Sequence, residues 1–330
     1  MNAIILADFG RKISPLTDGC PKSMLKIANL PLLDYTFAQL KHYGLNDIAF
    51  VSAVKNEKAF SYVSAYKGLN CRFYDDAAYG GSSEVIQAAN RGKEDIVVAI
   101  NCDSVNDIDL QGMIYTHADS GAKVTMAVVP QKAEEFKEAV LLDENNFVYA
   151  FSHRFGVYSA KTFSDAGVYV INKSALNRFK KGLTLESMRE FLSECVLNRT
   201  LKAFVHNGSY CAIEDAEGYF NANFYLKDGG FFPEVPSYEK ESVASATFGG
   251  SLVSTGAVTV GGFRDCIVGK GARIASCALI SDCVVMDDTL VTGKHSYAVI
   301  GPNFVENIAC PMNKTEFNPF YYDNLLQTGI

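Results

Sequence analysis

The first 53 residues of the chain constrain its fold more than any other stretch. The run Asn2–Ala7 is short, apolar and rich in Ile and Leu, which is typical of a buried parallel strand. Residues 32–43 carry apolar side chains at helical spacing and are followed by Gly44, and residues 47–53 predict a second apolar strand. A strand, a helix and a strand in this order form a βαβ unit, so we expect an α/β protein with a largely parallel sheet.

The loop after the first predicted strand has the chemistry of a phosphate site. Gly10 would let backbone N–H groups close on phosphate oxygens, and Arg11, Lys12 and Lys22 would supply positive charge. A glycine loop by itself is a weak signal, because an ordinary turn between a strand and a helix has the same composition. The residues around the loop make the signal specific.

Those residues form one long pattern: Leu6, Ala7, Gly10, Pro15, Leu16, Thr17, Pro21, Lys22, Met24, Leu25, Pro31, Leu32, Leu33 and Tyr35. The pattern resembles the opening signature of the sugar-1-phosphate nucleotidyltransferases. These enzymes join a nucleoside triphosphate (NTP) to a sugar 1-phosphate and release pyrophosphate. The resemblance implies a Rossmann-like domain with a mixed central sheet. It also assigns nucleotide binding to Leu6, Ala7, Gly10 and Arg11, and catalysis to Lys12 and Lys22.

A second nucleotide contact is expected after the third strand, at Gly81 and Ser82. The family carries a Leu-Gly-Thr-Ala segment here, and small residues permit close approach of a flat base. The alternative is structural, because Ser82 or Ser83 would equally well cap a helix that has Glu84 in its first turn.

Two acids are expected to hold Mg²⁺. Asp103 follows an apolar strand over residues 95–100 and matches the metal-binding aspartate of the family, with Cys102 in place of a glycine, where it would crowd the nucleotide. The alternative is that Asp103 caps a turn. The second aspartate of the family falls on Ala212, so we assign that role to Glu214, which points to the same side of a strand, and less readily to Asp215. The alternative is a carboxylate that favours a helix N-terminus.

The register of that second acid is fixed by Tyr219 and Asn223, which match the family. On the acceptor side, residues 165–169 fit the family's sugar-pocket pattern, in which Gly167 would let the backbone approach a hexose. The family's Glu-Lys-Pro is replaced by residues 152–154, so Arg154 is expected to bind the sugar phosphate, with a solvated surface arginine as the alternative. The acceptor is therefore a sugar 1-phosphate or a similar phosphate monoester.

Residues beyond the linker at 229–236 form a second predicted domain. Val268, Ile274, Ile280 and Met286 recur every six residues, which is typical of a left-handed parallel β-helix. We expect a nucleotidyltransferase domain over 1–235, this β-helix over 236–305 and a tail over 306–330. The β-helix would carry contacts of a homo- or hetero-oligomer, and an irregular β-sandwich is the alternative. His295 is interpreted as a surface or capping residue, and an acyltransferase is a distant third function.

Composition excludes several classes of partner. The net charge of −7 and the absence of long basic runs argue against a nucleic-acid or anionic membrane surface. The nine cysteines lack a CxxC pair, and most are interpreted as buried reduced thiols. With no signal peptide or membrane span expected, the predicted location is the cytoplasm.

Four departures from the family pattern lie close to the expected chemistry. They are the short loop with Asp8, the replacement of glycine by Cys102, the missing Glu-Lys-Pro and Ala212. The sequence therefore leaves two functions open: a working nucleotidyltransferase, or a catalytically impaired paralogue that serves as a regulatory or structural subunit.

Overall fold

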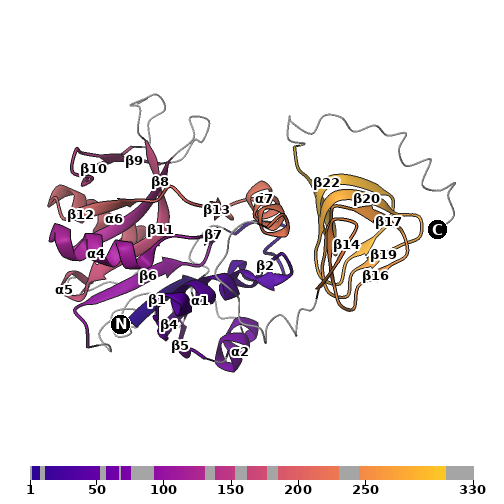
Figure 1. Cartoon of the computed structure of the whole chain (residues 1–330), viewed down its shortest axis with the longest axis horizontal. Helices are drawn as coiled ribbons and strands as arrows, with labels where there is room; N and C mark the ends of the chain where they lie inside the picture. The colour runs from indigo at the N-terminus through magenta and orange to yellow at the C-terminus, as the bar shows by residue number, and fades with distance from the viewer. Residues whose placement is uncertain are drawn as a thin grey trace. The chain divides into compact units, whose positions relative to one another are not determined.

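The computed structural model describes residues 2–7, 12–52, 57–66, 68–75, 93–130, 138–152, 162–176, 185–229 and 245–309. Contacts within the chain divide it into two compact units, residues 1–246 and 247–330, and each is described by itself (Figure 1). The predicted domain boundary at 235/236 lies outside the described residues. At the other predicted boundary, 305/306, a strand continues to Asn307.

The N-terminal unit is built on a mixed sheet. The strands of the whole unit are β1 (Asn2–Ala7), β2 (Lys26–Ile27), β3 (Leu30–Pro31), β4 (Asp47–Ser52), β5 (Asn70–Asp75), β6 (Ile96–Asn101), β7 (Ser104–Asn106), β8 (Val124–Pro130), β9 (Ala139–Leu142), β10 (Val148–Ser152), β11 (Phe163–Asn172), β12 (Leu201–Val205) and β13 (Tyr210–Ala212). Its helices are η1 (Lys22–Met24), α1 (Leu32–His42), α2 (Glu57–Ala65), α4 (Leu110–Ser120), α5 (Lys173–Leu176), α6 (Leu185–Leu197) and α7 (Ala216–Lys227).

Strand β1 lies near the centre of this sheet. The strand order is β10-β9-β11-β6-β1-β4-β5, with β8 beside both β11 and β12. Strands β6, β1, β4 and β5 are parallel, and β11 runs antiparallel to β6 (Figure 1). The predicted α/β fold with a mixed central sheet is confirmed.

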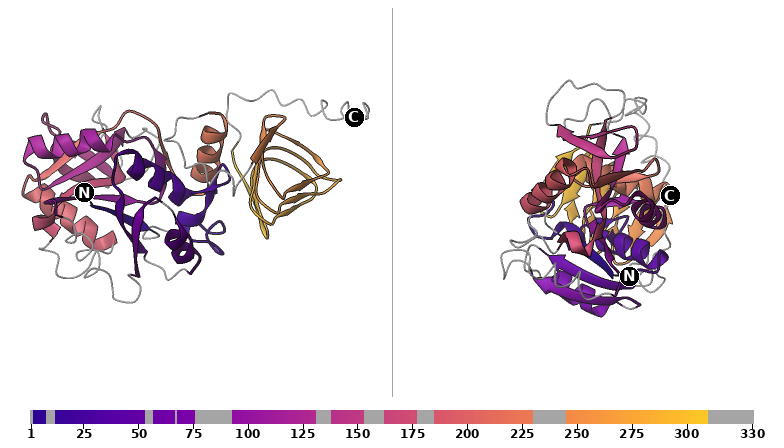
Figure 2. Two further views of the ribbon diagram at one scale, coloured as in Figure 1. Left: turned by 60° about the horizontal axis from the view of Figure 1, so that its bottom comes forward. Right: turned by 90° about the vertical axis from the view of Figure 1, so that its left-hand side faces the viewer.

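Both faces of the sheet are buried, which explains the nearly continuous apolar runs of its strands. Ile4 and Leu6 of β1 belong to a hydrophobic cluster that includes Phe191 and Leu192 of α6. The opposite face of β8 packs on α4, where His117 contacts Thr125. Figure 2 shows helices on both sides of the sheet. Because the two faces are covered, polar side chains are expected at the edge of the sheet where β1 and β6 have their carboxyl ends.

The C-terminal unit is a stack of short strands, most of them parallel, and the last, Phe304–Asn307, pairs antiparallel with its neighbour. They are β14 (Ser245–Phe248), β15 (Ser251–Ser254), β16 (Val258–Thr259), β17 (Gly262–Arg264), β18 (Ile267–Val268), β19 (Arg273–Ile274), β20 (Leu279–Val285), β21 (Leu290–Val291), β22 (Lys294–Gly301) and β23 (Phe304–Asn307). Leu252 pairs with Ile267, Ile267 with Val284 and Val284 with Val299, so successive coils are 15, 17 and 15 residues apart. The left-handed sense of the predicted β-helix stays a prediction.

The predicted hexad locates part of the core of this stack. Val268, Ile274 and Ile280 lie in the buried cluster, as expected, but Met286 does not, and Val285 and Val291 lie there instead. Three hexads span 18 residues, whereas the coils here are shorter. The inward positions must therefore shift by one residue after Ile280.

One corner of each coil is made by a residue with positive φ. Asp265, Asp282 and Tyr297 have φ of 51°, 49° and 49° and precede residues that are aligned in successive coils. Aspartate tolerates this left-handed conformation better than most residues because its short polar side chain bonds locally. The repeated corner residue keeps the coils in register.

The cysteines of the described residues are all free thiols, as expected. Cys102, Cys195, Cys266 and Cys283 are buried, which agrees with their apolar sequence surroundings. Cys277 is exposed and does not fit the interpretation of a buried thiol. It lies three residues after the end of the short strand β19, where a coil turns.

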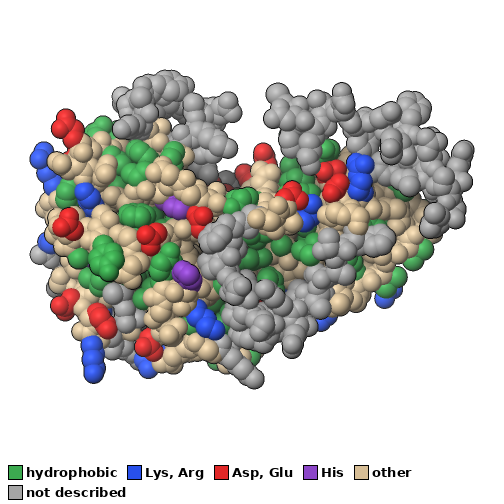
Figure 3. Space-filling view, in the orientation of Figure 1, with side chains coloured by type: hydrophobic (Ala, Val, Ile, Leu, Met, Phe, Trp, Pro, Cys, Tyr) green, Lys and Arg blue, Asp and Glu red, His purple; other side chains and the backbone are tan. Residues whose placement is uncertain are grey.

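Charged side chains are dispersed over the described surface. On the face shown in Figure 3, Lys, Arg, Asp and Glu side chains are scattered over both units. None of the described helices combines the length and the hydropathy that a membrane crossing needs. The expectation that nucleic acid and membranes are not partners stays a prediction.

Candidate active site

The predicted nucleotide contacts begin where β1 and β6 end. The strands are adjacent and parallel, with Leu6 paired to Asn101, and the Cys102 N–H donates to the Leu6 carbonyl at 3.1 Å. Leu6 is 8% exposed and Ala7 is fully buried. Their side chains are core residues, so any contact with a nucleotide would have to come from their backbone.

Lys22 lies in a short segment that is held at both ends. It opens η1 directly after Pro21, and its carbonyl accepts the Leu25 N–H at 3.0 Å. The residue is only 8% exposed. A buried lysine on a fixed turn is well placed to present one directed charge, whereas Lys12 is exposed.

Helix α7 anchors the hairpin that follows Lys22. The Tyr219 hydroxyl donates to the Lys26 carbonyl at 2.8 Å, and the Asn223 side chain accepts the Ala28 N–H at 2.8 Å. The Asn223 amide also donates to the Tyr219 carbonyl at 2.9 Å. The two residues that set the register in the sequence thus join segments almost 200 positions apart in the chain.

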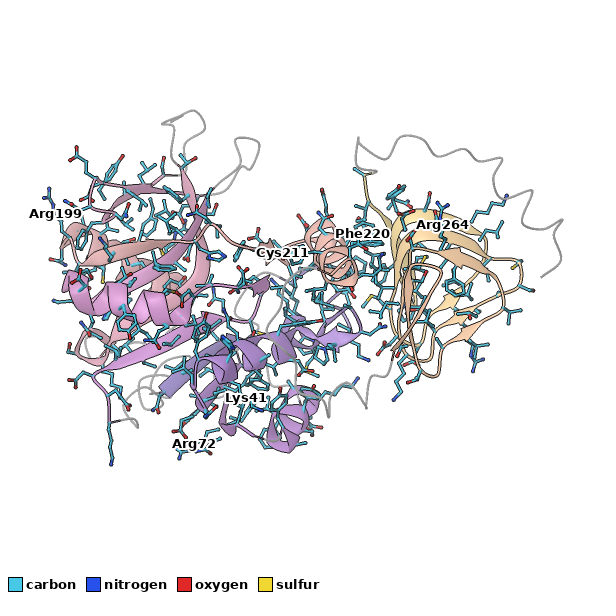
Figure 4. The ribbon with its side chains drawn as sticks, viewed as in Figure 1. Lys41, Arg72, Arg199, Cys211, Phe220 and Arg264 are labelled. Atoms are coloured by element: carbon cyan, nitrogen blue, oxygen red, sulfur yellow. The ribbon has the colours of Figure 1, made fainter. Side chains whose placement is uncertain are left out.

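Asp103 and Glu214 are brought together by a small antiparallel ladder. Strand β7 pairs with β13, with Ser104 opposite Ala212, and the Asp103 carbonyl accepts the Ile213 N–H at 2.8 Å. Asp103 is half-buried and Glu214 is exposed. Figure 4 labels Cys211 on β13, which lies between the main sheet and α7.

These two carboxylates act on a common neighbour, Tyr210 of β13. Burial is the main cause that raises the pKa of the Tyr210 phenol, and the negative charges of Asp103 and Glu214 raise it further. Both acids therefore lie close enough to influence one group. The prediction that Glu214 takes over the metal-binding role, which falls on Ala212 in the family pattern, is compatible with this arrangement.

Asp215, the second choice for the metal, is the N-cap of α7. Its Oδ1 accepts the Gly218 N–H at 2.7 Å. A Cβ on Gly218 would lie 2.4 Å from the Ala212 carbonyl oxygen, so glycine is needed where α7 begins against β13. Asp215 thus has the structural role that the sequence offered as its alternative.

The expectation that Cys102 takes room beside the nucleotide is wrong. Its side chain is buried and its sulfur accepts a hydrogen bond from the Thr36 hydroxyl of α1 at 3.6 Å. The thiol therefore occupies the interface between β6 and α1.

Gly167 is required for a reason that the sequence did not indicate. Its φ is +70°, and a Cβ there would lie 2.8 Å from Asn101 Nδ2 and 2.9 Å from Asn101 Cβ. The space against its Cα is therefore filled by Asn101. The predicted hexose contact of Gly167 stays a prediction.

Asp165 and Tyr169 at this edge were not among the site residues predicted from the sequence. The Tyr169 hydroxyl donates to Asp165 Oδ2 at 2.5 Å, and the Gly167 N–H donates to Asp165 Oδ1 at 2.8 Å. Burial raises the pKa of Asp165 to about 6, against these two hydrogen bonds. In a regular strand, residues four positions apart are separated by about 13 Å, so the spacing of Asp165 and Tyr169 in the sequence does not predict their contact. An irregularity in the strand brings the two side chains together.

The described residues offer oxygen ligands but no complete metal cage. Among them, no three His, Cys, Asp or Glu side chains lie close enough together to hold a metal ion. Mg²⁺ is commonly held by one or two carboxylates together with substrate phosphates. Asp103 and Glu214 fit that pattern because both supply hard oxygen donors.

Several predicted contacts lie outside the described residues. They are Gly10, Arg11, Gly81, Ser82 and Arg154. The roles expected for them in the phosphate loop, at the base and at the sugar phosphate stay predictions.

Comparison with known proteins identifies the family of the chain. The family model for nucleotidyl transferases matches residues 2–211. D-glycero-alpha-D-manno-heptose 1-phosphate guanylyltransferase of Aneurinibacillus thermoaerophilus is 25% identical over 230 residues, 69% of this chain and 99% of that protein. Mannose-1-phosphate guanylyltransferase of Mycobacterium tuberculosis is 22% identical over 306 residues, 87% of this chain and 80% of the relative.

A solved structure supports the fold. A candidate glucose-1-phosphate thymidylyltransferase of Bacillus anthracis, crystallised with sucrose, aligns with a TM-score of 0.58 at 14% identity over 70% of this chain and 96% of that one. At this identity the likeness shows the fold alone. Together with the family match over residues 2–211, it shows that the chain belongs to the nucleotidyl transferase family of enzymes.

Proposed function

We propose that the chain condenses an NTP with a sugar 1-phosphate, or a similar phosphate monoester, to give a nucleoside diphosphate derivative and pyrophosphate. An oxygen of the acceptor phosphate attacks the α-phosphorus of the NTP, and the bond from that phosphorus to pyrophosphate breaks. No bond to the protein forms. The protein's contribution is positioning and charge stabilisation.

One observation carries this proposal: the Lys22 segment and the strand leading to Glu214 are tied to the same helix. Tyr219 and Asn223 of α7 bond to the hairpin after Lys22, while α7 begins directly after Glu214. Asp103 bonds to that strand through its backbone. These links support a site in which one cation and two carboxylates from distant parts of the sequence meet at one sheet edge, where α/β proteins bind ligands.

Asp103 and Glu214 are the residues that would hold Mg²⁺. When bound, the ion would offset the negative charge of the reacting phosphates. Lys22 and Lys12 would add positive charge toward the same phosphates. The nucleotide would lie along the loop after β1, and the acceptor near Gly167 and Arg154.

The alternative of an impaired regulatory subunit is not favoured. The two relatives are guanylyltransferases. One of the four departures that suggested lost catalysis has no bearing on the open site, because the Cys102 side chain turns toward Thr36.

Three further features belong to the proposal. The C-terminal coil stack would be a left-handed β-helix, and it would carry the contacts of a homo- or hetero-oligomer. His295, whose Nε2 donates to the Thr292 carbonyl at 2.8 Å, has the capping role expected for it. The enzyme would act in the cytoplasm.

The test is pyrophosphate release by the purified full chain with Mg²⁺, each of the NTPs in turn and a panel of sugar 1-phosphates and other phosphate monoesters. We expect release with a defined pair of substrates. Replacing Lys22 or Asp103 by Ala should lower kcat/KM by about 100-fold or more, as for the loss of one preorganised charge. Lys41→Ala is the matched control, because Lys41 is exposed at the far end of α1.

Two results would contradict the proposed function. One is a folded protein that releases no pyrophosphate with any pair in the panel. The other is release that Lys22→Ala and Asp103→Ala leave at the level of the Lys41→Ala control.

A further inference from the structure

The carboxylate of Asp165 is held at the acceptor side of the site by a break in the sheet. Strand β11 pairs with β8 as Asp165 opposite Val128 and then Tyr169 opposite Met126, so its register shifts between these pairs. Such an irregularity re-aims side chains and is common near binding sites. Asp165 lies in the strand segment that bulges past the end of β6.

The bonding of Asp165 leaves it an anion with acceptor capacity. Its two oxygens each receive one hydrogen bond, from the Tyr169 hydroxyl at 2.5 Å and the Gly167 N–H at 2.8 Å. Each oxygen of a carboxylate has a second lone pair, and an ionised carboxylate can only accept. Protein atoms surround the carboxylate closely enough to disfavour its charge, yet the residue keeps exposed surface, so these lone pairs can reach a ligand.

Among the described residues, the charges that act on Asp165 have the same sign as its own. Asp103 and Glu138 are the acids whose charge acts on it, and both oppose its ionisation. Glu138 already pairs with Arg189 at 2.5 Å. Among the described residues, Asp165 forms no three-residue metal-ligand cluster with Asp103 and Glu214. Its charge is therefore suited to a ligand that brings a cation.

The neighbouring groups favour an organic cation. The Tyr169 phenol bonds to Asp165, and the Tyr210 phenol lies within electrostatic reach of both Asp165 and Asp103. A carboxylate accepts the N–H donors of an ammonium group with strong charge-assisted bonds.

We propose that Asp165 is a specificity-determining residue that receives a positively charged nitrogen of the acceptor. The preferred acceptor is then an amine-bearing phosphate monoester, and a neutral hexose phosphate is a poorer substrate. This inference rests on the proposed function, since it concerns the same reaction. A neutral hydroxyl would donate to the same oxygens but would bring no positive charge to offset the negative charge of Asp165.

The experiment compares acceptors of matched shape with the full chain and its best NTP. Glucosamine 1-phosphate is compared with glucose 1-phosphate, and phosphoethanolamine with 2-hydroxyethyl phosphate. We expect the wild-type KM to be at least about tenfold lower for the amine in the better pair, with kcat changed much less. Phosphocholine distinguishes recognition of the positive charge from recognition of the N–H donors, because it keeps the charge but has no N–H donor.

Asp165→Asn removes the charge and keeps the shape of the side chain. It should raise KM for the amine acceptor by about tenfold and raise KM for the neutral acceptor much less. Asp119→Asn is the matched control, because Asp119 is exposed near the end of α4. Equal wild-type kinetics for amine and neutral acceptors would overturn the inference, as would an Asp165→Asn variant that loses activity on both alike.

A binding readout keeps this inference distinct from the proposed function. If no acceptor reacts with any NTP, the proposed function fails, and the shift in melting temperature caused by each acceptor decides the role of Asp165. A shift with glucosamine 1-phosphate, absent with glucose 1-phosphate and lost in Asp165→Asn, supports it. Equal shifts, or no shift with either compound, overturn it.

Discussion

The two units of this protein bury their cores in different ways. In the N-terminal unit, β1 lies between β4 and β6, so neighbours in space are about 45 and 95 residues apart in the chain. In the C-terminal unit, stacked residues are 15 or 17 positions apart. The first arrangement brings residues that are distant in the sequence to one edge of the sheet. The second repeats the same contact between neighbouring coils.

This difference explains where the chemistry lies. The segments that carry Lys22, Asp103 and Glu214 are linked because α7 bonds to the hairpin after Lys22 and β13 pairs with β7. A coil stack has no such crossing, since each coil contacts its neighbours alone. We therefore expect the destabilisation caused by a core substitution to extend through the N-terminal unit but to stay local in the coil stack.

The largest expected effect comes from emptying each core. Phe37→Ala removes a fully buried ring that packs on Tyr66 and should lower the free energy of unfolding by about 3–5 kcal/mol. Ile280→Ala in the coil stack should cost about 2–5 kcal/mol. Hydrogen exchange should show loss of protection across the whole N-terminal sheet for the first variant, and only in β18, β20 and β22 for the second.

Leu290→Ala is the control for these core changes, because Leu290 is 64% exposed on the coil stack. It should change exchange very little. Loss of protection in Phe37→Ala that is confined to α1, or a loss throughout the stack in Ile280→Ala, would remove the contrast between the two units.

A smaller effect is expected at Gly167, where backbone strain and crowding are separable. Gly121 has a similar φ of +66° but no atom within 4 Å of the position that a Cβ would take, so Gly121→Ala reports the strain alone, about 1 kcal/mol. Gly167→Ala adds the collision with Asn101 and should cost about 1–3 kcal/mol more. Urea unfolding of the two variants measures the difference, and equal costs would show that Asn101 moves aside freely.

The smallest effect concerns His117. Its Nε2 contacts Asn172 at 3.2 Å and its Nδ1 contacts the Thr125 hydroxyl at 2.9 Å, which suits a neutral ring, and burial lowers its pKa from 6.5. Below pH 6.5 the unfolded chain binds a proton that the folded chain does not, so stability falls as pH decreases, by at most about 1.4 kcal/mol per pH unit.

His117→Gln should remove that part of the pH dependence, as followed by urea unfolding between about pH 7.5 and 5.5. The variant must be compared with wild type, because the contribution of Asp165 to stability changes with pH in the opposite direction to that of His117. Its pKa is raised to about 6, so the folded state binds the extra proton and its contribution falls as pH rises toward 6. Parallel profiles for the variant and wild type would show that His117 titrates alike in both states.

Much of the fold could be predicted from local patterns. The strands at β1, β4, β6, β8, β11 and β12 follow from apolar runs whose composition alone indicates burial. The ladder between β7 and β13 could not be foreseen, because each strand has only three residues and their pairing spans about 100 positions. The coil stack falls between these cases, since the hexad located Val268 and Ile280 but failed where a coil shortened.

By itself, the sequence determined the family and the βαβ opening, because short motifs and apolar periodicity are written in neighbouring residues. The roles of Lys22, Asp103 and Glu214 stay predictions from those motifs. Only the tertiary structure decided where side chains point. It turned Cys102 toward Thr36, used Asp215 as a helix cap and set Asp165 beside Tyr169. The physical reason is that direction depends on contacts between distant segments, which spacing along the chain does not record.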